Sequence, residues 1–323
     1  MKFCFSALLV YLLSFLSVKA QELELKKSYE YELPDGYDCT FMEAINQKLV
    51  ITCPKTNSFF YLEHTKNQTL QSVTYTIGSG PEEMSRAPFG IGILEEKVVL
   101  MDPGLRRVLT YEKKTNGLSV NKLNVRNSLL GLYSTYKKDT VFLKTWSGLE
   151  GTDIGFFYNV NTFEKSKSYK LPEEISVFEA PGDIEITDDK ILFASLKRGV
   201  VYEWQINGEN ESNQWKIFDF EPKYRNVNYN GKPAQISTGS EHEILDIEYN
   251  PLNGNQFFLL INSVNGEDTF MSNFIYVFDR SEEKIVDRIE LEAEANLMEI
   301  ESDFLFLHYE DEDKLVKYEI LKK

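Results

Sequence analysis

Apolar residues recur along the whole chain in short runs of four to seven, either continuous or alternating with polar residues. Examples are KLVITC (48–53), KILFAS (190–195) and NFIYVFDR (273–280), all rich in Val, Ile, Phe or Tyr. β-Branched and aromatic residues in runs of this length are typical of strands, and the Gly, Asn, Asp, Lys and Pro residues between them are typical of turns. Long stripes with helical spacing are missing from the sequence. The pattern therefore predicts an all-β protein.

A small motif repeats six times: an apolar residue, then Glu or Gly, then a second apolar residue, followed by a turn and an apolar strand. Its central residues are Glu43, Gly92, Gly131, Glu185, Glu248 and Glu299. Units of roughly fifty residues have room for four short strands each, which is the size of a propeller blade. We therefore predict a six-bladed β-propeller. The rival all-β fold is a pair of sandwiches.

The two ends of the chain favour a closed ring. Only two strand-like runs follow Glu299, so the sixth unit is one strand short, whereas residues 23–33 precede the first unit and have no place in it. We expect this N-terminal strand to complete the last blade as its outer strand. Residues 21–323 would then form a single six-bladed domain.

The first twenty residues have the pattern of a signal peptide, with Lys2, an apolar run and the small-residue exit Val18-Lys19-Ala20. The apolar run is shorter than the roughly 20 residues of a membrane-spanning helix, so an uncleaved anchor is the less favoured alternative. An exported protein, secreted or periplasmic, without membrane insertion is expected. The net charge of −16 disfavours nucleic acid as a partner and favours cations, basic partners or neutral ligands. We expect a monomer.

Cys39 and Cys53 bracket two β-patterned runs that turn near Asn46. With a two-residue turn, Asn46-Gln47, Cys53 faces Thr40 and the two cysteines point to opposite sides, although the apolar residues match well. With a three-residue turn, Cys39 stands opposite Cys53, and the other copies of the repeat also leave about three turn residues. In an exported protein we expect a disulfide between Cys39 and Cys53; the alternative is two buried free thiols. Asn67 and Asn210 begin glycosylation sequons, which matter only in a host that glycosylates.

The stretch YTIGSGPEEMSRAPFGIGILEEKVVLMDPGLRRVLTYEKKTNG (75–117) resembles the secreted six-bladed propellers of the NHL and TolB-like type common in bacterial envelopes. The residues that match that pattern are Gly78, Gly80, Pro81, Asp102, Arg107 and Tyr111, while Glu82 replaces a glycine. A weaker similarity, through residues 98–118, is to the yellow and royal-jelly propellers of insects. The resemblance implies a propeller fold, and most members of the bacterial group have no assigned activity.

The repeated Glu-or-Gly position carries the clearest candidate chemistry. The first strand of each blade lines the central channel of a propeller, and a residue between two core-facing neighbours points to the opposite side. The channel would then hold an incomplete acidic ring of Glu43, Glu185, Glu248 and Glu299, with Asp183 and Asp246 two places earlier in their copies. Carboxylate oxygens suit Ca²⁺ or Mg²⁺, so a cation or amine site is predicted. The alternative is solvated carboxylates, or carboxylates paired with Lys48, Lys97, Lys190 or a backbone amide.

A second candidate surface lies on the long connection between the fourth and fifth units, residues 207–243. It holds an aromatic and polar mixture that suits sugars or protein contacts: Trp215, Phe218, Tyr224, Arg225 and Tyr229. The alternative is a packed loop. No nucleophile elbow, P-loop or zinc-type histidine spacing occurs, so we assign no catalytic residue. We favour a binding or interaction propeller for an unknown protein, carbohydrate or small ligand over a metal-dependent hydrolase or lactonase with a divalent cation in the channel.

Overall fold

The structure is a computed structural model of the 323-residue chain. The residues that it describes are 23–33, 39–64, 69–88, 90–94, 97–102, 104–112, 117–122, 128–136, 139–146, 153–162, 164–170, 182–196, 198–208, 212–218, 223–229, 232–239, 242–263 and 272–322. The predicted signal peptide and the sequons at Asn67 and Asn210 lie outside these residues. No helix in the described ranges is long and apolar enough to cross a membrane.

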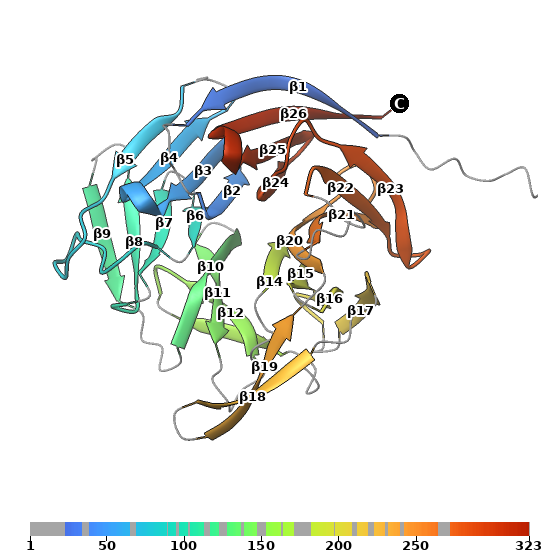
Figure 1. The fold of residues 1–323 in the computed structure, drawn as a ribbon. Coiled ribbons are helices and arrows are strands. Elements are labelled where there is room, and N and C mark those ends of the chain that lie inside the picture. The colour runs from blue at the N-terminus through green and yellow to red at the C-terminus, as the bar shows by residue number, and fades with distance from the viewer. Residues whose placement is uncertain are drawn as a thin grey trace, which may run out of the picture.

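Six four-stranded antiparallel sheets in the described chain surround a central axis as the blades of a propeller (Figure 1). Blades 1 to 3 consist of β2 (Phe41–Ile45), β3 (Lys48–Cys53), β4 (Ser58–Glu63) and β5 (Gln71–Thr74); β6 (Ile91–Leu94), β7 (Lys97–Asp102), β8 (Arg107–Glu112) and β9 (Gly117–Lys122); and β10 (Ser128–Tyr136), β11 (Thr140–Trp146), β12 (Asp153–Asn159) and β13 (Lys165–Lys170). Blades 4 and 5 consist of β14 (Gly182–Ile186), β15 (Lys190–Ser195), β16 (Val200–Gln205) and β17 (Ser212–Lys216); and β20 (His242–Tyr249), β21 (Gln256–Ser263), β22 (Phe274–Asp279) and β23 (Lys284–Glu290). The prediction of an all-β, six-bladed propeller is confirmed.

The last blade is closed by the N-terminal strand, as predicted. β24 (Leu297–Glu301), β25 (Phe304–Tyr309) and β26 (Lys314–Lys322) are joined by β1 (Leu23–Glu32), which pairs antiparallel with β26 from Leu23 opposite Lys322 to Glu32 opposite Lys314. In Figure 1 the blue β1 lies beside the red β26. Both ends of the described chain therefore belong to one sheet, and the ring closes through main-chain hydrogen bonds.

Each copy of the repeated motif lies on the innermost strand of its blade. Those strands contact one another in a closed ring, in the order β2, β6, β10, β14, β20 and β24 and back to β2. The second strands of the blades are largely buried, because apolar side chains project from both of their faces. Every pair of neighbouring blades shares one hydrophobic cluster, such as the one that joins Leu192 of blade 4 to Phe257 of blade 5. A blade therefore has no core of its own and depends on its neighbours.

Two further features interrupt the regular ring. β18 (Lys223–Tyr229) and β19 (Lys232–Gly239) form a separate two-stranded hairpin between blades 4 and 5, at the foot of Figure 1. Among the described residues, the short 3₁₀ helices η1 (Pro54–Thr56) and η3 (Glu310–Glu312) follow β3 and β25.

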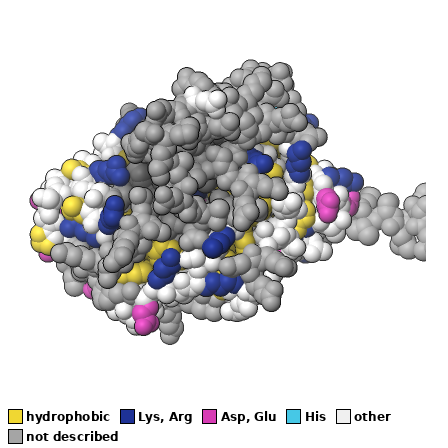
Figure 2. All heavy atoms as spheres, turned by 90° about the horizontal axis from the view of Figure 1, so that it is seen from below, with side chains coloured by type: hydrophobic (Ala, Val, Ile, Leu, Met, Phe, Trp, Pro, Cys, Tyr) yellow, Lys and Arg dark blue, Asp and Glu magenta, His cyan; other side chains and the backbone are white. Residues whose placement is uncertain are grey.

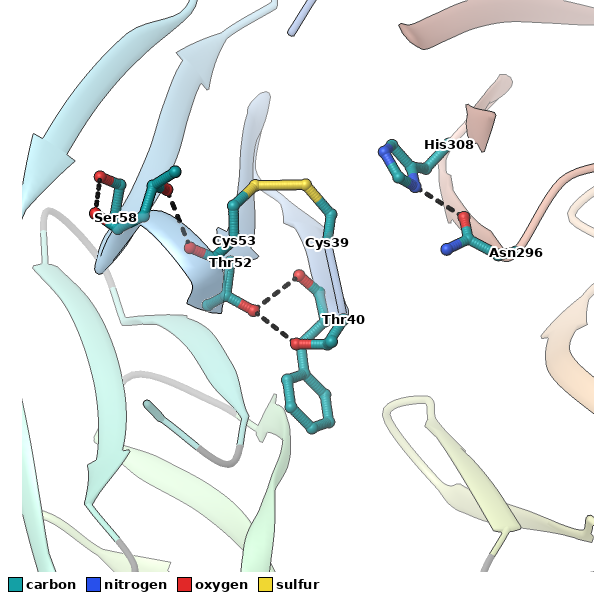
Figure 3. Close-up of a disulfide and its surroundings, with 9 residues drawn as sticks. Cys39, Thr40, Thr52, Cys53, Ser58, Asn296 and His308 are labelled. Atoms are coloured by element: carbon teal, nitrogen blue, oxygen red, sulfur yellow. Dashed lines mark hydrogen bonds between the residues drawn. A yellow bond between two sulfur atoms is a disulfide. The ribbon is translucent and has the colours of Figure 1, made fainter. Parts of the chain in front are cut away.

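The disulfide between Cys39 and Cys53 is present (Figure 3). It forms without the three-residue turn that we associated with it. β2 and β3 pair in the register of Ile45 opposite Lys48, which leaves the two-residue turn Asn46-Gln47 with both φ angles positive. The Thr40 N–H donates to the Thr52 carbonyl at 3.0 Å, so Thr40 and Phe41 both lie against Thr52. This local shift of one residue brings the two cysteine Cα atoms to 4.2 Å.

Other copies of the repeat also have two turn residues rather than three. Leu94 pairs with Lys97, and Glu301 pairs with Phe304. The Thr187 N–H donates to the Lys190 carbonyl, which again leaves two residues between them. Short turns fit because their backbone twist matches the twist of the two strands that they join.

Candidate functional site

A cavity of about 260 Å³ lies on the propeller axis and is lined mainly by the inner strands β2, β14, β20 and β24. All six acidic residues predicted for the channel line it: Glu43, Asp183, Glu185, Asp246, Glu248 and Glu299. Blades 1, 4, 5 and 6 supply these side chains. Of the motif glycines, Gly92 is described and does not line the cavity, although its neighbour Ile91 does.

The cavity has a layered wall, because β2, β14 and β24 contribute only their first three or four residues to it. The four glutamates are the last lining residue on their strands and form its floor. Asp183 and Asp246 stand two positions earlier on β14 and β20. One strand residue advances by roughly 3.3 Å, so the aspartates lie roughly one layer above the glutamates.

Burial and mutual repulsion shift the ionisation of the floor. Burial raises the pKa of Glu248 well above its usual value of 4.5, and the charges of Glu185 and Glu299 raise it further. The pKa of Glu185 is raised by burial and then by Glu43, and that of Glu299 by burial, Glu43 and Glu185. The floor therefore favours protonated carboxyl groups or a positively charged occupant.

The aspartates also hold hydrogen bonds that link blades. The Asp183 carboxylate accepts from the Ile247 N–H at 3.2 Å, and the Asp246 carboxylate accepts from the Met298 N–H at 2.6 Å. Burial raises the pKa of Asp246 well above its usual value, followed by the charge of Asp183 and a hydrogen bond with its carboxyl group. Glu299 accepts from the Ala44 N–H. Backbone amides therefore partner several of the acidic residues, among them Asp183, Asp246 and Glu299.

Glu248 differs from these residues. Its side chain is only 4% exposed, it lines the cavity, and the described residues supply it with no hydrogen bond or ion pair. Among the three lysines considered as partners of the ring, Lys97 pairs with Glu112 at 2.6 Å and Lys190 with Glu203 at 3.5 Å. Lys48 stands opposite Glu63 in the β3–β4 ladder. A group that neutralises the charge of Glu248 would therefore have to lie in the cavity.

Sequence reasoning missed one buried base near the cavity. Lys144 of β11 stands opposite Gly131, is 2% exposed, and donates to the Gly182 carbonyl at 2.7 Å. Burial lowers its pKa to about 7, although the charge of Asp183 opposes the shift. The sequence offered one signal for Lys144: it is a lysine within the apolar run TVFLKTW, and the motif residue opposite it is the glycine Gly131.

The apolar upper wall was also missed. Phe41, Leu196, Leu245 and Leu297 line the cavity and are half-buried. Phe41 and Leu297 each stand two positions before a floor glutamate, so the repeat itself marks them.

The spacing of the acidic residues bears on the predicted Ca²⁺ or Mg²⁺ site. Within the described ranges, no three His, Cys, Asp or Glu side chains are grouped closely enough to hold a metal ion. Figure 2 views the ring from below the orientation of Figure 1, and on this side the coloured residues include more Lys and Arg than Asp and Glu side chains.

The second predicted surface is only partly described. Trp215 is half-buried with its ring 6.0 Å from that of Phe257, and the Arg280 guanidinium lies 5.9 Å from the Trp215 ring. Phe218 is 8% exposed and packs at 5.3 Å against the ring of His242. These two residues thus pack between blades 4 and 5. β18 carries the others, whose side chains lie outside the described part: Tyr224, Arg225 and Tyr229. A ligand surface on this insert stays a prediction.

No protein-family model and no curated protein matches the chain. Solved structures of similar fold include virginiamycin B lyase from Staphylococcus aureus, with a TM-score of 0.55, 13% identity, and coverage of 93% of this chain and 100% of that one. A member of the DUF4221 family from Bacteroides vulgatus has a TM-score of 0.58 at 11% identity, covering 94% and 100%. The WD40 repeats of RRP9 have a TM-score of 0.58 at 10% identity, covering 93% and 100%. At these identities the likeness shows the propeller fold alone.

Proposed function

We propose that this protein is an exported binding propeller whose axial cavity takes a small cationic ligand. Glu248 carries the proposal, because a carboxyl group that is 4% exposed, lines a cavity and receives no hydrogen bond from the described residues is costly unless it is protonated or neutralised. The neighbouring acidic residues add to the same negative potential. A cation at the floor would offset both the burial of Glu248 and the repulsion from Glu185 and Glu299.

Propellers commonly serve as interaction scaffolds, which agrees with a binding role. Export is supported by the leader-like residues 1–20 and by the Cys39–Cys53 disulfide, since disulfides form and persist in oxidising compartments. Membership of the NHL and TolB-like group is part of the same proposal and is supported by the matched residues around Asp102 and Arg107. In the structure the Arg107 Nε donates to Asp102 at 2.9 Å and its Nη1 donates to the Gly80 carbonyl at 2.8 Å, so these motif residues hold the GSGP turn.

A divalent metal ion is the second candidate for the site, because carboxylate oxygens suit Ca²⁺ and Mg²⁺. The alternative function, a metal-dependent hydrolase or lactonase, requires such an ion. The spacing of the acidic residues favours an organic cation, whose ammonium hydrogens reach several separate carboxylates, over a bare ion that needs its ligands gathered at one point.

The test is thermal unfolding of the protein in EDTA, then with Ca²⁺, Mg²⁺, Mn²⁺, Zn²⁺ or millimolar butylamine. A ligand held only by the folded state raises the midpoint by mass action. We expect butylamine to raise it in the wild type and in Glu294→Gln, a change at an exposed glutamate, but not in Glu248→Gln. A rise with metal ions alone would replace the amine by a metal and favour the hydrolase alternative. If no cation shifts the midpoint, or if Glu248→Gln responds like the wild type, the proposal fails.

A further inference from the structure

We infer that the ligand of the axial cavity is an amphipathic amine: one primary ammonium group on a short apolar chain. This inference rests on the proposed cation-binding function and names the ligand class of the same site. It follows from the vertical order of the lining residues, in which apolar side chains lie above the glutamate floor and share their level with Asp183 and Asp246.

The apolar layer, here called the collar, consists of Phe41, Leu196, Leu245 and Leu297. They come from blades 1, 4, 5 and 6, the same blades that supply the floor glutamates. Phe41 and Leu297 precede Glu43 and Glu299 by two strand residues, which places them roughly 7 Å above the floor. Leu196 follows Ser195, which stands opposite Gly182, so it lies above the level of Asp183. Its carbonyl accepts from the Ile244 N–H, which places it next to Leu245.

Each collar residue is half-buried, so part of its apolar surface still faces the cavity. The hydrophobic clusters between blades take up the remainder: Phe41 packs on the blade 1–2 cluster, Leu245 on the blade 5–6 cluster, and Leu297 on the blade 6–1 cluster. An apolar ligand segment would remove this remaining surface from water. Each buried methylene then tightens binding by about threefold to fourfold.

The floor provides the complementary end. Glu248 is nine-tenths buried, faces the cavity and has no hydrogen bond from the described residues, which is an observation separate from the mere gathering of acids. The cavity volume of about 260 Å³ is slightly below the roughly 300–1,000 Å³ of pockets that hold drug-sized molecules. One charged group and a chain of a few carbons fit these dimensions. At the collar level the Asp183 and Asp246 carboxylates already accept main-chain hydrogen bonds. A second charge at the far end of the chain would therefore lose its hydration against the collar with less compensation than the floor gives the first charge.

The experiment is isothermal titration calorimetry of the full protein at pH 7.5 with ethylamine, butylamine and hexylamine. Hexan-1-ol tests the need for charge, and 1,6-diaminohexane tests the effect of a second charge. We expect affinity to rise about threefold to fourfold for each added methylene from ethylamine to butylamine. Hexylamine should bind more tightly than diaminohexane, and hexanol should give no measurable heat.

Two collar variants and one control locate the effect. Leu245→Asn and Leu297→Asn should remove most of the gain per methylene and leave ethylamine affinity within about twofold. Val286→Ala, which trims a half-buried residue of β23 away from the cavity, should behave as the wild type. If a collar variant fails to fold, the chain-length series on the wild type decides the question by itself.

The failures are distinguishable. If no amine binds, the proposed function fails, and the inference fails with it. If amines bind through Glu248 with an affinity independent of chain length, cation binding stands and the apolar collar is overturned. A derivative that carries the lysine side chain, Nα-acetyl-lysine methylamide, separates two sources of the same chemistry: tighter binding than pentylamine assigns the ammonium to a peptide side chain, and weaker binding assigns it to a free amine.

Discussion

The Asp183 carboxylate of blade 4 accepts a hydrogen bond from the Ile247 amide of blade 5, with 3.2 Å between Oδ2 and N. The same relationship recurs from Asp246 to Met298 across the next interface, and from Glu299 to Ala44 across the one after that. The inner strand of a blade has one edge that faces the axis and has no further strand to pair with, so its N–H groups need other acceptors. Acidic residues on the preceding blade supply them, which gives Asp183, Asp246 and Glu299 a structural role in joining the blades.

Replacement of Glu248 by Gln should change how stability depends on pH. Because the pKa of Glu248 is raised above 4.5 in the folded protein, the folded state keeps a proton that the unfolded state has released once the pH exceeds about 4.5. The free energy of unfolding then falls as the pH rises through that window, by up to about 1.4 kcal/mol per pH unit. Glu248→Gln should lack this decrease. Urea unfolding at pH 5, 6.5 and 8 should therefore show that the free energy of unfolding of the variant increases relative to that of the wild type as the pH rises. Equal slopes for the two proteins would contradict the assignment.

Lys144→Met should show the opposite trend. The folded protein holds the Lys144 pKa at about 7, below its ordinary 10.5, so between these values the unfolded state binds a proton that the folded state lacks. The free energy of unfolding of the wild type should therefore rise from pH 7 to 9.5 relative to Lys144→Met, by up to about 1.4 kcal/mol per unit. Lys170→Met, at an exposed position, serves as the control. A difference that does not change with pH would show that the buried amine is not neutral.

Loss of the Cys39–Cys53 bond should lower stability without changing the fold. Removal of a disulfide that closes a loop of this length costs about 2–4 kcal/mol. The double variant Cys39→Ser, Cys53→Ser should therefore unfold at lower urea, and dithiothreitol should shift the wild type to the same midpoint. Dithiothreitol should have no effect on the double variant. A wild type that does not respond to reduction would mean that the two thiols are not bonded.

Glu301→Ala should loosen the seam between blades 6 and 1. The Glu301 carboxylate lies 2.5 Å from the Nε2 atom of His64 and accepts from the Gln47 N–H at 2.6 Å, while the Lys317 ammonium lies 3.1 Å from the His64 Nδ1 atom. Removing the carboxylate leaves the buried His64 and Lys317 side chains without this negative neighbour, which costs about 3 kcal/mol. Glu319→Ala is the matched control, because Glu319 and Lys26 are exposed and 3.9 Å apart, an arrangement worth less than about 1 kcal/mol. Equal losses for the two variants would remove the special role of Glu301 in closing the ring.

The sequence alone determined the class of fold, the number of blades and the strand that closes the ring. These features depend on local properties: the alternation of apolar residues, the turn residues between runs, and a motif that returns once per blade. The same motif placed all six acidic residues on inner strands, so the existence of an acidic axial cavity was also predictable.

Only the tertiary structure decided which of these residues meet. The two-residue turn at Asn46-Gln47 and the disulfide coexist because a shift of one residue at Thr40 changes the register, and no pairing rule for regular strands contains that shift. Lys144 reaches Gly182, and Asp246 reaches Met298, across blade interfaces that join residues distant in the sequence. Sequence periodicity specifies which face of a strand is apolar, whereas the rotation of one blade against the next specifies which polar groups share an interface. Glu248 is therefore left facing the cavity by the packing of three blades, which no single repeat encodes.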